Sequence, residues 1–258
     1  SRAYVISNGD YLSRVTDDDY HFSETIIWTG STSSNWSTAA NWSTNSVPAP
    51  SDNVSIPAAP ANHPVVNEAP GTPAVCNDLT IASGAFVTIA PGKALTVNGT
   101  LANNAGNGGL LLQSDATGTA SLLHNTAGVN ATLQRYIPGS TELDDMVYHL
   151  VSVPLTPETN STSNLFLGSY LYNFSESTNA WIIMGTSTTN IMDETRGYMV
   201  YYPGANITYG FEGPMNHNSF TALTTFTPGK SPMAGNYGLN LVPNPYPSAI
   251  DWNATSGW

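Results

Sequence analysis

The chain has 258 residues, of which 18 are acidic and 6 are basic, and its formal net charge is −12. Nucleic acids and anionic membrane surfaces are bound by clustered lysines and arginines, so this composition argues against both as partners. No apolar run approaches the ~18 residues of a membrane-spanning helix, and the sequence therefore predicts no membrane insertion.

Short β-branched runs bounded by glycine, proline and asparagine recur along the chain, and helical periodicity is nearly absent. Aromatic residues make up 10% of the sequence, which is typical of a folded β protein rather than of a disordered chain. We therefore predict an all-β fold that consists of many short strands.

Residues 1–27 follow no pattern that assigns them to a fold. They contain the densest cluster of charge in the chain, formed by Asp17, Asp18 and Asp19. Carboxylates suit Ca²⁺, which takes six to eight oxygen ligands. Three consecutive residues on a strand cannot all point to one side, so at most two would share an ion. A calcium site and a solvated acidic loop both remain open, and no other cofactor is expected.

Trp28, Trp36 and Trp42 follow in a segment that is rich in serine, threonine and asparagine. Two interpretations of these rings stand side by side. Exposed rings beside amides could stack on sugars, the polar groups satisfying the sugar hydroxyls. Alternatively, the rings could cap the open end of a repetitive β structure, which would otherwise expose its core and its unpaired edges.

The clearest repeat lies between residues 79 and 101, where three strand-like triplets start eight residues apart: Leu79–Ile81, Val87–Ile89 and Leu95–Val97. Each triplet puts two apolar side chains on one face and a threonine on the other. We expect neighbouring copies to stack, as in a solenoid such as a parallel β-helix, with a sandwich as the alternative. Later runs that continue the series favour the solenoid: Leu110–Leu112, Ser121–Leu123 and Thr132–Gln134.

After residue 138 the predicted strands become longer and more aromatic, at 146–153, 169–174, 180–184, 197–202 and 207–211. This pattern of longer, aromatic strands predicts an antiparallel, jelly-roll-like β-sandwich. The predicted organisation is therefore an unassigned extension (1–27), a β-solenoid with a tryptophan-rich cap (28–138) and a β-sandwich (139–258) that we expect to continue past Trp258.

The sequence offers no catalytic constellation. Its histidines are far apart and lack metal-binding spacing: His21, His63, His124, His149 and His217. There is no nucleophile elbow and no phosphate-binding loop. A glycosidase would need two carboxylates that flank the bond, and the acids are mostly scattered singly. We therefore predict that the chain is not an enzyme.

Three groups of motifs resemble the large secreted or surface-displayed, adhesin-like proteins of Bacteroidetes, many of which are exported by type IX secretion. The first group surrounds the tryptophans, from Trp28 to Pro57. The second begins at Cys76-Asn77-Asp78-Leu79 and continues through the repeats to Tyr136. The third comprises Tyr148–Ser152, Arg196–Tyr202 and the block Asn244-Pro245-Tyr246-Pro247-Ser248-Ala249-Ile250-Asp251-Trp252.

The resemblance implies a location outside the cell or on the bacterial surface, further β modules of the same polypeptide, and a C-terminal sorting domain beyond Trp258. We expect a non-enzymatic structural or adhesive module whose partners are glycans or surface proteins. The alternative is a carbohydrate-binding module of a secreted polysaccharide-degrading enzyme, with Trp28, Trp36 and Trp42 as the candidate sugar-binding residues.

Overall fold

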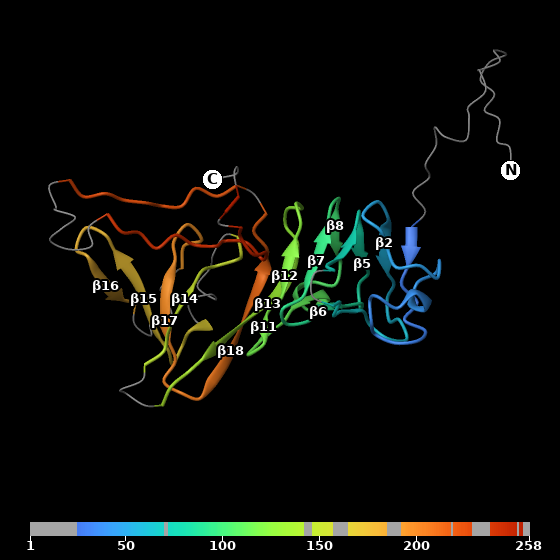
Figure 1. Cartoon of the computed structure of the whole chain (residues 1–258), viewed down its shortest axis with the longest axis horizontal. Coiled ribbons are helices and arrows are strands. Elements are labelled where there is room, and N and C mark those ends of the chain that lie inside the picture. The colour runs from blue at the N-terminus through green and yellow to red at the C-terminus, as the bar shows by residue number, and fades with distance from the viewer. Residues whose placement is uncertain are drawn as a thin grey trace, which may run out of the picture.

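The computed structural model describes residues 25–69, 72–141, 146–156, 165–184, 192–217, 219–228, 238–251 and 253–254. Over these residues the chain is all-β, as predicted, with eighteen strands and two short 3-10 helices, η1 (Ala39–Asn41) and η2 (Asn107–Gly109). Within the same ranges no helix has the length and apolar character needed to cross a membrane. Figure 1 shows a solenoid (blue to green) that leads into antiparallel sheets (yellow to red).

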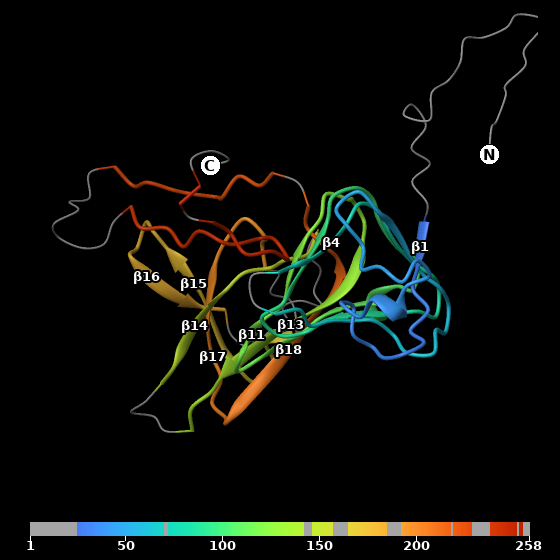
Figure 2. The same ribbon diagram turned by 45° about the vertical axis from the view of Figure 1, so that its right-hand side comes forward.

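The solenoid has about three turns, each of which adds one strand to each of three parallel sheets. The first turn comprises β2 (Asn53–Ile56), β3 (Val65–Val66) and β4 (Ala74–Cys76). The second comprises β5 (Leu79–Ile81), β6 (Val87–Ile89) and β7 (Ala94–Val97), and the third β8 (Leu101–Asn103), β9 (Leu110–Leu112) and β12 (Ser121–Leu123). In the turned view of Figure 2 these turns overlap one another.

The triplets of the eight-residue repeat are arranged differently from the prediction. Leu79, Val87 and Leu95 belong to β5, β6 and β7, which lie in three different sheets, so the neighbouring triplets form the three sides of one turn. Stacking occurs between residues one full turn apart: Leu79 pairs with Val54 on one side and with Leu101 on the other. The expectation that neighbouring triplets stack on one another is therefore wrong, although the solenoid itself is present.

Aliphatic side chains in rows fill the interior of the solenoid. One sheet contributes Val54, Leu79 and Leu101, and all three are at most 1% exposed. Threonines such as Thr80 point outward, as the period of two requires. This aliphatic row continues through all three turns, so removal of the buried Leu79 side chain leaves a cavity between two neighbours.

β13 (Asn130–Pro138) links the solenoid to the rest of the chain. It pairs in parallel with β9 at Thr132 and Leu133, and it pairs antiparallel along its whole length with β18 (Asn206–Pro214). The predicted boundary at residue 138 falls at the last residue of this strand. One cluster of buried hydrophobic residues runs through both parts.

The C-terminal part contains a second antiparallel sheet, in the order β14 (Tyr148–Val151), β17 (Tyr198–Tyr201), β15 (Tyr170–Ser175) and β16 (Ala180–Ile183). A small hairpin of β10 (Ser114–Asp115) and β11 (Gly118–Thr119) projects from the third turn of the solenoid, and β1 (Thr25–Ile27) pairs with β2 at the other end. The antiparallel pairing expected for this part is present, and its closure into a jelly-roll-like sandwich stays a prediction.

We expect Leu79→Ala to lower the free energy of unfolding by about 2–5 kcal/mol, because it opens a cavity in the middle turn. Thr80→Val, at the next and outward-facing position, should change this free energy by less than about 0.5 kcal/mol. Urea unfolding, followed by circular dichroism, measures both values. Equal effects of the two substitutions would contradict the stacked-row description of the core.

Candidate functional site

The three tryptophans form a buried cluster over the first turn of the solenoid. Trp28, Trp36 and Trp42 are each at most 1% exposed. The Trp42 ring meets the other two edge to face, with centroids 4.8 Å from Trp28 and 4.7 Å from Trp36. The indole N–H of Trp28 donates to the carbonyl of Asn62 (2.6 Å), and that of Trp42 donates to the carbonyl of Trp36 (2.8 Å). Stacking on a sugar requires an exposed ring face, and in this arrangement none of the three offers one.

Asn41, which sequence reasoning missed, holds the loop that carries these rings. It is fully buried, and its Oδ1 accepts the N–H groups of Thr32 (3.0 Å) and Ser33 (2.9 Å). Its amide nitrogen donates to the carbonyl of Asn35 (2.9 Å) and to Ser33 Oγ (3.0 Å). The side chain thus replaces the strand pairing that this irregular segment lacks. An asparagine directly before a buried tryptophan was the available signal, but it is too common to be specific.

The proposed calcium ligands Asp17, Asp18 and Asp19 lie outside the described residues, so a calcium site there stays a prediction. Within the described ranges, no three His, Cys, Asp or Glu side chains come together in a way that could hold a metal ion.

The outer face of the second antiparallel sheet presents large uncharged side chains. Cross-strand pairing places Tyr148, Tyr201 and Tyr170 in one row. A second row consists of Leu150, Met199, Tyr172 and Ile183. A third, shorter row consists of Phe174 and Trp181. Because side chains alternate along a strand, these nine residues share one face of the sheet, which we call the aromatic face.

The opposite face of the same sheet is buried over much of β14, β17 and β15, whereas Ile182 of β16 is 45% exposed on it. Its side chains include Val151, Leu171, Tyr198 and Val200, which are between 0 and 7% exposed. The aromatic face therefore points away from the core. Its rings contact one another across the strands, with centroid distances of 5.6 Å between Tyr148 and Tyr201 and 5.2 Å between Phe174 and Trp181.

Much of the aromatic face is open to solvent. Tyr148 is 42% exposed, Leu150 65%, Tyr170 46%, Trp181 42% and Ile183 55%, whereas Tyr201, between Tyr148 and Tyr170, is 3% exposed. None of the nine side chains carries a formal charge at neutral pH. A soluble chain seldom leaves a contiguous group of this kind without a partner, so the aromatic face is the candidate functional site.

Glu176 is a buried residue, and its hydrogen bonds hold a loop in place. It is 4% exposed. Its carboxylate accepts hydrogen bonds from the Thr227 hydroxyl (2.7 Å), the Thr227 N–H (3.0 Å) and the Gly238 N–H (2.9 Å). These hydrogen bonds, led by that of the Thr227 hydroxyl, lower the pKa of Glu176. It lines an open pocket of about 400 Å³ that contains no second carboxylate, so this pocket lacks the pair that a glycosidase needs.

Cys76 is buried and is not a nucleophile at neutral pH. Burial, followed by the charges of Asp78 and Asp52, raises the pKa of the Cys76 thiol to about 12, so it stays protonated at neutral pH. Burial first, and His217 second, lower the pKa of His124 to about 4.

The block from Asn244 to Ile250, which carries part of the family resemblance, covers an edge of the solenoid. β12 is the last strand of its sheet, and its Leu122 N–H donates to the carbonyl of Pro247 (3.1 Å). The Ala249 N–H donates to Ser121 Oγ (3.3 Å). Within the block, Asn244 Oδ1 accepts the Tyr246 N–H (3.0 Å), which fixes the turn. In Figure 1 this red segment runs back to the solenoid.

We expect Asn41→Ala to lower the free energy of unfolding by at least about 2 kcal/mol, because two buried N–H groups lose their acceptor. The tryptophans should also become accessible, which red-shifts their fluorescence. Ser46→Ala, at an exposed position of the same loop, serves as the control. Wild-type stability and fluorescence in Asn41→Ala would contradict the role of this side chain.

Acid should destabilise the fold through His124. Its pKa is about 4 when folded and about 6.5 in an unfolded chain. Between these values the unfolded state binds more protons, so stability falls as the pH drops from about 6.5 to 4, by up to about 3 kcal/mol. Above pH 6.5 the histidine makes no such contribution.

His124→Gln removes this titration, whereas His63→Gln leaves it in place. Unfolding free energies measured at several pH values should therefore decline less steeply in His124→Gln than in the wild type and in His63→Gln. Parallel curves for all three proteins between pH 6.5 and 4 would show that His124 is not the responsible group.

Comparison with known proteins places the chain in one family. The model of the family described as "Domain of unknown function (DUF8693)" matches residues 27–256. That range holds the whole solenoid, the tryptophan cluster and the aromatic face. No curated protein and no solved structure matches the chain. Because the match covers far more than half of the sequence, the chain belongs to the DUF8693 family.

Proposed function

We propose that this chain is a non-enzymatic, extracellular, adhesin-like module and that the aromatic face is its contact surface. The aromatic face carries the proposal. Five of its large side chains are 42–65% exposed on a regular sheet, where the strands hold the rings in fixed relative positions. A partner that covers them removes apolar area from water at little cost in side-chain entropy.

The solenoid supports the structural half of this proposal. Its interior is filled with buried aliphatic rows, and its first turn is covered by the tryptophan cluster. Stacked strands without free ends resist local opening, which suits a stalk that presents another surface. The two antiparallel sheets, β13–β18 and β14–β17–β15–β16, would form the jelly-roll-like sandwich that carries the contact surface.

The resemblance to Bacteroidetes surface proteins supports a location outside the cell, and the low charge of 9% Asp, Glu, Lys and Arg is compatible with it. The same resemblance supports export by type IX secretion and further β modules in the polypeptide. Calcium bound by Asp17, Asp18 and Asp19 would add to the stability of such a module.

A second candidate function is carbohydrate binding as part of a secreted polysaccharide-degrading enzyme. The exposure of Tyr148, Tyr170 and Trp181 on one sheet face favours it, because flat aromatic surfaces stack on the apolar faces of sugar rings. In this proposal the residues that stack on the sugar belong to the aromatic face, and not to the buried tryptophan cluster.

The test is binding of the purified chain to arrays of plant, algal and host glycans and of extracellular proteins, with and without Ca²⁺. We expect saturable binding that falls at least about tenfold in the double variant Leu150→Asp/Ile183→Asp, since each charge must be desolvated in the contact. Thr80→Asp, on the outside of the solenoid, is the matched control and should bind normally.

The class of ligand decides between the candidates. Binding to proteins favours the adhesin, and binding to glycans favours the carbohydrate-binding module. Binding that survives in Leu150→Asp/Ile183→Asp, or no binding on either array, would refute the aromatic face as the contact surface.

A further inference from the structure

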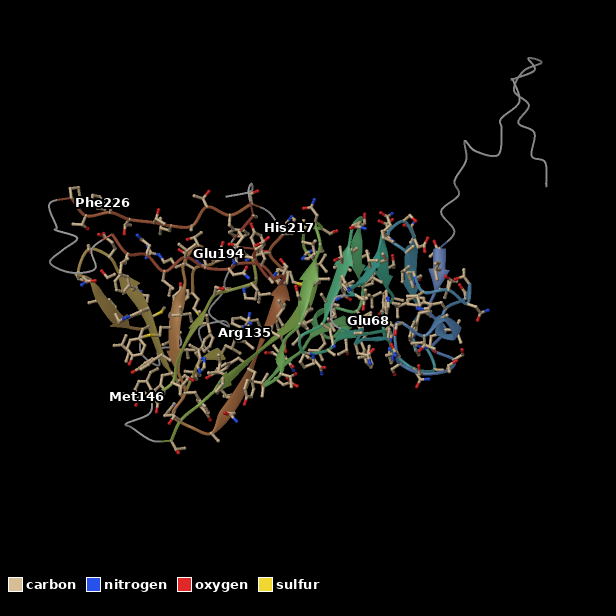
Figure 3. The ribbon with its side chains drawn as sticks, in the orientation of Figure 1. Glu68, Arg135, Met146, Glu194, His217 and Phe226 are labelled. Atoms are coloured by element: carbon tan, nitrogen blue, oxygen red, sulfur yellow. The ribbon has the colours of Figure 1, made fainter. Side chains whose placement is uncertain are left out.

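Arg135 occupies a position in β13 where its neighbours bury apolar side chains. Ala131, Leu133 and Ile137, at the same phase of the strand, are 0, 5 and 2% exposed. Because side chains alternate along a strand, Arg135 belongs to this inward row. Figure 3 shows it in the middle of the molecule, where β13 passes from the solenoid to the antiparallel sheets.

Among the residues that the structure describes, the guanidinium of Arg135 has no acidic partner. Its Nη1–H donates to Thr119 Oγ1 (3.1 Å), and the ion pair found within the described ranges joins Arg196 and Asp193 instead. Burial lowers the pKa of Arg135, but the guanidinium stays protonated at neutral pH. A partly buried cation without a counter-charge is unfavourable unless an anion accompanies it.

Hydrogen bonds fix the direction of this cation. Thr119 Oγ1 lies 2.8 Å from Ser114 Oγ, which also accepts the N–H of Tyr136 (3.0 Å). These hydrogen bonds tie the hairpin of β10 and β11 to β13 at Arg135 and at the next residue, Tyr136. Thr119 occupies one of the five N–H donors of the guanidinium, and the other four remain available.

Arg135 lines a pocket of about 140 Å³ between the third turn of the solenoid and the block Asn244–Ile250. Its lining includes the apolar residues Leu112, Pro154 and Phe211 and the hydroxyl-bearing residues Ser121 and Ser248. The described residues that line the pocket include no aspartate or glutamate. It therefore combines one positive charge, neutral hydrogen-bonding groups and an apolar surface, as small-molecule sites do.

We propose that this pocket binds a small carboxylate with a short apolar body. The planar fork of a guanidinium matches the two oxygens of a carboxylate. A single arginine balances one negative charge, which suits a carboxylate better than a phosphate dianion. A cavity of ~150 Å³ holds a molecule of benzene size, so a body of a few carbon atoms fits against the apolar lining residues.

The bound anion would lie between β13 and the Asn244–Ile250 block, so it would contact both the solenoid and the segment that covers its edge. Binding to the folded state alone raises the melting temperature. The pocket and the aromatic face share no residues. An experiment can therefore refute this site without refuting the proposed contact surface, and the reverse.

The test uses the whole chain with butyrate, its uncharged analogue butyramide, and inorganic phosphate, in a buffer free of carboxylates. Ligand-observed NMR and melting temperatures report binding. We expect saturable binding of butyrate that raises the melting temperature, and weaker binding of phosphate and butyramide. Equal binding of butyrate and butyramide, tighter binding of phosphate, or no binding of butyrate would each overturn the proposal without any variant.

Arg135→Met keeps an apolar side chain in the inward row, and Arg196→Met removes an exposed, already paired arginine as the matched control. Butyrate affinity should fall at least about tenfold in Arg135→Met, because the charge-assisted hydrogen bonds are lost, and it should be unchanged in Arg196→Met. Unchanged affinity in Arg135→Met would overturn the proposal. If that variant does not fold, Arg135→Lys, which keeps the charge but loses the fork, should still bind more weakly than the wild type.

Discussion

The stacking of aliphatic side chains inside the solenoid is the interaction on which the rest of the structure depends. Each strand of the three turns has only two to four residues and could not bury an apolar face by itself. Burial is achieved when Val54, Leu79 and Leu101 form one continuous row across the turns. The same stacking creates a problem at each end, where a row stops and strand edges lack partners.

Three different devices solve that problem. At the first turn, Trp28, Trp36 and Trp42 cover the row, and the side chain of Asn41 satisfies the backbone of their loop. At the last turn, β13 continues one sheet and changes from parallel to antiparallel pairing along its second edge. A second sheet ends at β12, which the Asn244–Ile250 block covers. The C-terminal part is thus joined to the solenoid by the groups that close it.

The functional proposals rest on two features that depart from the usual pattern, one in the interior and one on the surface. In β13, where Ala131, Leu133 and Ile137 are buried at the same phase, Arg135 places a charge in the inward row. On a surface with few charges, one sheet face concentrates exposed rings and branched aliphatic residues. Neither feature is explained by packing, because a leucine at position 135 and polar residues on the sheet would fold at least as well. The binding proposed above would give a physical reason for both.

The sequence by itself determined the class of fold and favoured a solenoid over a sandwich, because alternation of apolar residues and turn-forming residues is a local property. It also pointed to a cap at the tryptophans as one of two interpretations. It did not determine the stacking partners of Leu79, Val87 and Leu95, since an eight-residue period describes both stacked neighbours and the three sides of one turn. The tertiary structure decided this through the register between turns, and it also decided that Trp28, Trp36 and Trp42 are buried while Tyr148, Tyr170 and Trp181 are exposed. Burial and the absence of a counter-charge at Arg135 depend on segments far apart in the sequence, and only folding brings those together.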